Sequence, residues 1–175
     1  THIDLQVHAG EVIGLLGRNG AGKTTLIRLV MGMLRTEKGA VKVFGEDPRH
    51  DPVATRKRIG YVAEDQELPP FLRVHEVIAM YREMYPKWDE AFADDLMNRF
   101  ELPPDRKIKD LSRGQARQVA LLCAVSHRPD LLILDEPAGG LDPAARREFM
   151  ETSIRLLNEA GTTILFSSHH MSDVE

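Results

Sequence analysis

The feature that most constrains this sequence is the run GRNGAGKT at residues 17–24. It matches the pattern G-x-x-x-x-G-K-[ST], in which glycines let successive backbone N–H groups curl around phosphate oxygens. An apolar stretch at 11–16 precedes the run, and apolar residues at helical spacing follow it (Leu26, Leu29, Val30 and Met33). A strand, a phosphate-binding loop and a helix in this order predict an α/β fold with an anion site at the start of the helix.

The side chains of this loop predict how it would hold a nucleotide. Lys23 is placed to reach the β- and γ-phosphates, and the Thr24 hydroxyl is placed to coordinate Mg²⁺. The alternative is a chance glycine-rich turn, which the complete pattern between a strand and a helix disfavours. The candidate nucleotide-binding residues are Gly17, Arg18, Asn19, Gly20, Ala21, Gly22, Lys23, Thr24 and Thr25.

A second candidate region is the run LLILDE at residues 131–136, an apolar strand that ends in two carboxylates. A buried parallel strand delivers its C-terminal residues to the ligand crevice, beside the phosphate loop. There Asp135 would bind Mg²⁺, through water because this ion sheds its hydration reluctantly. Glu136 would accept a proton from the water that attacks the γ-phosphate. Unless the pair is only a solvated strand end, the two regions together predict a P-loop NTPase.

Three further segments narrow the class. LSRGQ at 111–115 resembles the LSGGQ signature of ABC ATPases, with Arg113 in place of the first glycine. EPAGGLDP at 136–143 resembles the end of their acidic strand motif and the D-loop that follows it, and SH at 168–169 resembles their switch histidine. In the order and spacing of these motifs, essentially the whole chain is similar to the ATP-binding cassette of an ABC transporter.

That resemblance implies an ATPase that powers transport, with ATP and Mg²⁺ as cofactors and with Lys23, Glu136 and His169 in catalytic roles. Transmembrane permease subunits and a second cassette, identical or different, are the implied partners. The signature of each cassette would close over the ATP held by the phosphate loop of the other. The implied location is cytoplasmic, peripheral on the inner face of the cell membrane through the permease. The further nucleotide contacts that it implies are Ser112, Gly114, Gln115 and Asp142.

The signature also has a physical reading of its own. Ser112 can cap a helix that runs to about residue 127, and Gln115 three residues later completes a capping-box pattern. The helix start then offers N–H groups, a hydroxyl and Gly114 to an anion. Helix capping by itself would also explain these residues if they stood alone.

Two positions carry alternatives. His169 follows Ser168 at a strand end and is preferred over the adjacent His170 as the histidine that contacts the γ-phosphate. Glu64 stands where the family has a glutamine, and we expect it to contact the nucleotide and Mg²⁺. Gln66 is the alternative, although a slip of two residues would disturb the strand register.

Glu64 and the segment YPKWD at 85–89 resemble the cassettes of drug, antibiotic and bacteriocin exporters, which favours export over import. Trp88 in this segment has the simpler interpretation of a core anchor. The transported substrate is chosen by membrane subunits and cannot be read from this chain.

Breaker signals divide the chain into an ATP-binding α/β core at 1–66 and 129–175 and a helical subdomain at 67–128 that carries the signature. The expected core is a P-loop, RecA-like sheet with an N-terminal antiparallel β portion. The sequence starts on strand-like alternation and stops on what reads as the first turn of a helix, so we expect it to be cut at both ends. The aromatic residue that stacks on adenine in the family would then lie upstream. The expected strands are 3–7, 11–16, 40–44, 59–63, 131–134 and 162–166, and helices are expected around 26–33, 74–81, 92–100, 112–127 and 143–159.

Composition excludes several other classes. The net charge of −4 argues against a nucleic-acid partner, because phosphate-backbone binding needs a surplus of Lys and Arg. The single cysteine, Cys123, lies in an apolar run and is expected to be a small buried hydrophobe. No apolar stretch approaches the ~18–20 residues that cross a bilayer. The remaining alternatives are a soluble ABC-type ATPase of translation or DNA repair and a non-hydrolysing regulatory cassette.

Overall fold

The computed structural model describes residues 3–64, 67–159 and 161–169. Its strands are β1 (Val12–Leu16), β2 (Ile59–Val62), β3 (Leu131–Asp135) and β4 (Thr163–Ser168). Its helices are α1 (Lys23–Val30), α2 (Pro52–Lys57), α3 (Val74–Met84), α4 (Glu90–Arg99), α5 (Arg113–Val125) and α6 (Pro143–Glu159), with a short 3-10 helix (Ile108–Asp110) before α5. The helices and the four core strands expected from the sequence are thus confirmed, with small shifts of their ends.

Within the described residues the strands form one parallel sheet in the order β1-β4-β3-β2. Val12 pairs with Ile164, and Leu131 pairs with both Thr163 and Ile59, so the strands start nearly level. All five residues of β3 are buried, as expected for a central strand with both faces covered. Because the strands are parallel, their carboxyl ends share one edge of the sheet, where α/β folds place their ligands.

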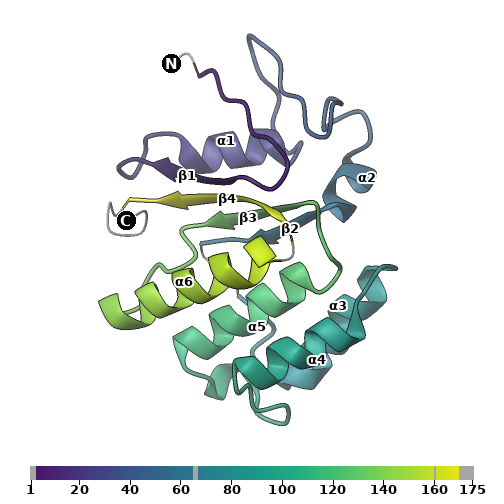
Figure 1. The fold of residues 1–175 in the computed structure, drawn as a ribbon, viewed down its shortest axis with the longest axis vertical. Coiled ribbons are helices and arrows are strands. Elements are labelled where there is room, and N and C mark those ends of the chain that lie inside the picture. Colours follow the sequence, from purple (N-terminus) through teal and green to yellow (C-terminus); the bar gives the residue numbers. More distant parts are fainter. Residues whose placement is uncertain (1–2, 65–66, 160, 170–175) are drawn as a thin grey trace.

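The sheet lies between two layers of helices, with α1 on one face and α5 and α6 on the other (Figure 1). Alternate residues of β3 serve the two sides: Ile133 packs in the cluster around Ile27 of α1, and Leu132 packs in the cluster that includes α5. Helices α3 and α4 pack against α5, farther from the sheet (Figure 1). Ile27, Leu132 and Ile133 are fully buried, and burial of each contributes roughly 1.5–3 kcal/mol to folding.

Local signals explain where several helices begin. The Asp51 carboxylate accepts the Ala54 N–H at 2.9 Å at the start of α2, and Asp89 accepts the Phe92 N–H at 3.0 Å at the start of α4. Such caps satisfy backbone donors that have no partner within the helix. At α5 the predicted capping box is confirmed, and Ser112 is its N-cap.

The expected antiparallel strands at 3–7 and 40–44 are absent from the described residues. Ile3 and Leu5 are exposed, because no neighbouring strand covers the apolar side of that alternation. In the second segment, Phe44 and Gly45 take positive φ values of 55° and 88° and close a tight turn. Only an isolated antiparallel bridge between Val43 and Glu46 remains there. Apolar content alone did not reveal this turn, because its first central residue is a phenylalanine, which rarely adopts positive φ.

Candidate nucleotide-binding site

The phosphate loop connects the end of β1 to the start of α1. Gly20 and Gly22 have φ values of 82° and 97°, a region that other residues enter only with strain. The Gly17 N–H donates to the Ser168 carbonyl at 3.2 Å and so fixes the start of the loop against the end of β4. The loop borders a cleft of about 230 Å³. The residues that line this cleft are Asn19, Gly20, Ala21, Gly22, Lys23, Thr24, Thr25, Glu64 and Glu136.

Lys23 folds back over its own loop. Its Nζ donates to the Gly17 carbonyl at 2.6 Å and to the Arg18 carbonyl at 3.4 Å. The same Nζ lies 3.2 Å from Oε1 of Glu136, and only 9% and 7% of the two side chains are exposed. Burying a charge costs free energy unless the charge is paired. The ion pair therefore lowers the cost of burying both Lys23 and Glu136. The ammonium of Lys23 therefore lies beside the cleft, where an anion could replace the carbonyl and carboxylate oxygens that it now contacts.

Asp135 and Thr24 face each other across the same cleft edge, with the Thr24 hydroxyl 3.4 Å from Oδ1 of Asp135. A hydroxyl and a carboxylate oxygen are hard donors that suit Mg²⁺, which takes few protein ligands and keeps water and phosphate as the others. Among the described residues, no group of three or more His, Cys, Asp or Glu side chains is arranged to hold a metal ion. The donor set therefore fits a metal shared with phosphates, and does not fit an enclosed protein site.

Ser167 is a site residue that the sequence did not reveal. Its hydroxyl donates to Oδ1 of Asp135 at 2.6 Å and accepts the N–H of Glu136 at 2.9 Å. It is fully buried and lies directly opposite Asp135 in the β3–β4 ladder. Given the strand order, Ser167 could have been predicted from the sequence, because it lies in register with Asp135 at the acidic end of β3.

Glu136 connects the acidic strand to the predicted switch histidine. Its Oε2 lies 2.8 Å from Nδ1 of His169, while its Oε1 faces Lys23. The backbone of Glu136 has φ 47°, a left-handed conformation that costs a non-glycine residue roughly 1–3 kcal/mol. Strain of this kind persists only where the surroundings hold it, and here it aims the carboxylate into the cleft. His170, the alternative histidine, lies outside the described residues.

Glu64 follows β2 and lines the cleft beside the loop that begins at Glu136. A β-carbon on Gly139 would lie 4.0 Å from Cγ of Glu64, so the two loops are neighbours. Gln66, the alternative to Glu64, lies outside the described residues.

The signature residues do not join this cleft. Ser112 accepts the Gln115 N–H at 3.1 Å, and the Gln115 side chain accepts the Ser112 N–H at 3.1 Å, at the start of α5 beside Gly114. Asp142 caps the other helix start of this region, since its carboxylate accepts the Ala144 N–H at 3.1 Å. Of the starts of α1, α5 and α6, only that of α1 contributes residues to the lining of the cleft.

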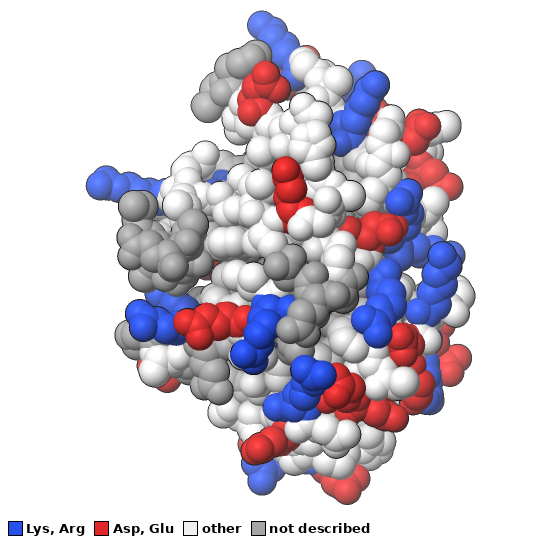
Figure 2. Space-filling view, viewed as in Figure 1, with Lys and Arg blue, Asp and Glu red and all other residues white. Residues whose placement is uncertain are grey.

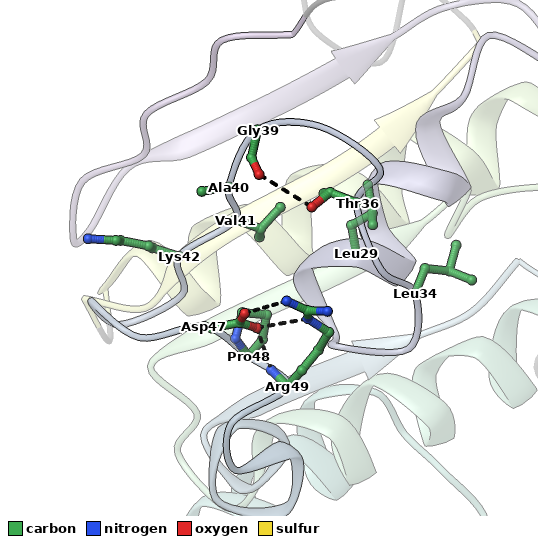
Figure 3. A pocket seen from close by; sticks show the side chains of 10 residues that line it. All are labelled: Leu29, Leu34, Thr36, Gly39, Ala40, Val41, Lys42, Asp47, Pro48 and Arg49. Atoms are coloured by element: carbon green, nitrogen blue, oxygen red, sulfur yellow. Dashed lines mark hydrogen bonds and ion pairs between the residues drawn. The ribbon is translucent and has the colours of Figure 1, made fainter.

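A further pocket of about 160 Å³ lies beyond the C-terminal end of α1 and contains none of the predicted site residues (Figure 3). There Arg49 donates from Nε to Oδ1 of Asp47 at 3.0 Å and from Nη2 to Oδ2 at 2.5 Å. These hydrogen bonds hold the pKa of the Asp47 carboxyl below its usual value. Leu29, Leu34 and Val41 supply apolar walls. The pocket is therefore lined by an internal ion pair, by Lys42 and by apolar side chains, and it shares no residue with the cleft at the phosphate loop.

Cys123 and His127 are buried groups outside the cleft. Burial raises the pKa of the Cys123 thiol far above its usual value, which confirms the expected inert cysteine. Burial lowers the pKa of His127 to about 4, and its ring stacks on Tyr85 with centroids 4.0 Å apart. His127 is therefore an uncharged packing residue at neutral pH.

Comparison with known proteins decides the family. The family described as "ABC transporter" matches residues 1–139. The chain belongs to this family. The "ABC transporter ATP-binding protein YtrB" of Bacillus subtilis (strain 168) is 33% identical over 173 residues, which are 99% of this chain and 59% of that protein. The "Daunorubicin resistance ATP-binding protein DrrA3" of Streptomyces coeruleorubidus is 34% identical over 99% of this chain and 56% of its own length.

Solved structures agree on the fold. The structure described as "cbiO1 from clostridium perfringens: Part of the ABC transporter complex cbiONQ" has a TM-score of 0.84 and 29% identity, and the match covers 98% of this chain and 72% of that one. The α/β fold with a parallel sheet is therefore that of ABC ATPase domains. The present chain spans less than three fifths of the length of the curated relatives named above. None of the described helices is both long and apolar enough to span a membrane.

Proposed function

We propose that this chain is the ATP-binding and hydrolysing part of an ABC transporter. The observation that carries the proposal is the carboxylate of Glu136, held between Nζ of Lys23 at 3.2 Å and Nδ1 of His169 at 2.8 Å. A buried carboxylate between two groups that can donate to phosphate, beside an intact phosphate loop, suits general-base hydrolysis of a phosphoanhydride.

In this mechanism the N–H groups of the phosphate loop and of the first turn of α1 receive the phosphate chain. Lys23 exchanges the Gly17 and Arg18 carbonyls for the β- and γ-phosphate oxygens. Lys23 would also give up its ion pair with Oε1 of Glu136, and this oxygen would then accept the proton of the attacking water. His169, whose Nδ1 contacts the other oxygen of that carboxylate, would orient it and contact the γ-phosphate through its second ring nitrogen.

Thr24 and Asp135 are the residues proposed to hold Mg²⁺, and Ser167 keeps Asp135 in place. When bound, Mg²⁺ would neutralise charge on the transferring phosphate. Glu64 is proposed to face the same metal and nucleotide from the loop after β2.

The proposed partners are permease subunits in the membrane and a second cassette, with the chain on the cytoplasmic face. Support for the second cassette comes from the start of α5, where the signature residues Ser112, Gly114 and Gln115 lie away from the cleft of their own chain. Export is the proposed direction, supported by relatives named for daunorubicin resistance, for linearmycin resistance and for Nod factor export. We propose no nucleic-acid partner: on the face in Figure 2, basic and acidic side chains lie interspersed over the helices.

The decisive experiment is Glu136→Gln. It should keep MgATP binding and lower turnover by about 10²-fold or more, the loss expected when a general base is removed. Turnover is measured by phosphate release and binding by calorimetry, and ATP should drive dimers visible by gel filtration once hydrolysis is blocked. Unchanged turnover would remove Glu136 from the mechanism, and absence of nucleotide binding by the unaltered protein would remove the function.

A further inference from the structure

Two arginines on α5 contact the backbone of the loops that carry cleft residues. Nη1 of Arg117 donates to the Ala63 carbonyl at 2.7 Å, and its Nη2 donates to the Glu64 carbonyl. Nη1 of Arg113 donates to the Gly140 carbonyl at 3.4 Å. Residues four apart on a helix lie on the same face, so one side of the first turns of α5 reaches both loops.

These two loops leave the sheet side by side. Val62 pairs with Leu134 at the ends of β2 and β3, so the residues that follow them emerge as neighbours. The first loop carries Glu64 into the cleft, and the second loop begins with Glu136. The arginines therefore contact the main chain of the segments whose side chains line the nucleotide cleft, without lining that cleft themselves.

The chemistry of the contacts suits a mechanical role. A guanidinium is planar and permanently charged, and its fork can serve two adjacent carbonyls at once, as Arg117 does. The Arg113 contact is longer and exposed, so we expect it to be the weaker of the two. At Gly140, which has φ 74°, a β-carbon would lie 3.3 Å from Nη1 of Arg113, so the arginine lies directly against the loop backbone.

We propose that Arg113 and Arg117 are positioning residues for hydrolysis. They fix the loops of Glu64 and Glu136 to the start of α5, so that the placement of the catalytic carboxylate depends on the position of this helix. A partner that binds Ser112–Gln115 and shifts the start of α5 would therefore shift the cleft loops too, through the hydrogen bonds of Arg113 and Arg117. The inference rests on the proposed hydrolysis of ATP.

The test is steady-state MgATP hydrolysis by Arg117→Met, Arg117→Lys, Arg113→Met and Arg113→Lys. Loss of positioning acts on the chemical step, so kcat should fall about tenfold in Arg117→Met and about threefold in Arg113→Met, while KM stays within about twofold. The lysine variants should recover part of kcat, because an ammonium can still reach one carbonyl. Arg99→Met is the matched control, because Arg99 lies on the exposed side of α4 and pairs with Asp95 one turn away. Its replacement should leave both constants unchanged.

Three results would overturn the inference. A raised KM at constant kcat in the Arg113 variants would make Arg113 a phosphate contact. A lowered melting temperature with unchanged kcat would show that both arginines only stabilise the fold. Values of kcat and KM equal to those of Arg99→Met would show that they have no role in hydrolysis. If Arg117→Met fails to fold, Arg117→Lys and the two Arg113 variants decide. No hydrolysis by the unaltered protein would contradict the proposed function itself, a result distinct from these three.

Discussion

The starts of α1 and α5 use the same chemical feature, the unpaired N–H groups of a first helical turn, in opposite ways. At α1, the N-cap is Gly22 in a left-handed conformation, and no side chain caps the helix among the described residues. At α5, Ser112 and Gln115 close a capping box on each other's backbone. The first helix start has no side-chain cap and borders a cleft. The second has a side-chain cap on its Gln115 N–H and lies away from that cleft.

The surroundings of the two sites differ as well. The α1 site is supported by residues far apart in the chain. Ser167 of β4 hydrogen-bonds both the carboxylate of Asp135, at the end of β3, and the backbone N–H of Glu136, which follows β3. The capping box of α5 joins residues only three positions apart, although Arg113 and Arg117 of the same helix contact the distant loops at Gly140 and Ala63. Substitution of a capping residue should therefore remain local, whereas substitutions at the first site should affect several elements.

The largest effect should come from Lys23→Ala. The buried Glu136 would lose its cation and the phosphates their main counter-charge, so MgATP binding should weaken and hydrolysis should fall below detection. Calorimetry and phosphate release measure the two effects. Normal hydrolysis by this variant would mean that the start of α1 is not the nucleotide site.

Ser167→Ala should come next. It leaves the buried N–H of Glu136 and one oxygen of Asp135 without their shared partner, which costs about 1–3 kcal/mol of unfolding free energy. Because both acidic residues lose their support, kcat should fall about tenfold or more while nucleotide binding changes less. Thermal unfolding and steady-state kinetics check this. A stable variant with full activity would show that the two acidic residues are placed without β4.

Glu64→Gln tests the charge that this sequence carries where its family has glutamine. One unit of repulsion at ~6 Å costs about 0.7 kcal/mol in water, so the variant should bind ATP about threefold more tightly in EDTA. At millimolar Mg²⁺ it should bind equally or less tightly, because hard cations favour anionic oxygen. Calorimetric titration under both conditions distinguishes these outcomes. An equal shift with and without Mg²⁺ would mean that Glu64 does not face the metal and would turn attention to Gln66.

The smallest effect is expected from Ser112→Ala. Removal of an N-cap serine costs about 1 kcal/mol of stability, seen as a lower denaturation midpoint, and the affinity of an isolated chain for MgATP should not change. Ser112→Asp is the matched control, because aspartate caps equally well. Weaker nucleotide binding by isolated Ser112→Ala chains would contradict the separation of the two helix starts.

Local patterns predicted much of this molecule, and long-range pairing set the rest. The phosphate loop, the acidic strand end and the Ser112–Gln115 capping box are contiguous segments whose chemistry follows from spacing alone. Ser167 escaped notice because its role depends on β4 lying next to β3, which no local pattern states. The strand expected at 40–44 failed for the same reason, since the chain turns at Phe44 where a sheet partner would have been needed.

The burial of Cys123 has a practical consequence. It is the single thiol of the sequence, and it lies on α5 in the core that joins this helix to α3 and α4. An alkylating reagent can reach it only when that packing opens, so its labelling rate in the folded protein reports the free energy of opening of the α5 region. The alkylation rate of Cys123, measured by mass spectrometry, therefore reports how often the packing around the signature helix opens, and no probe has to be introduced.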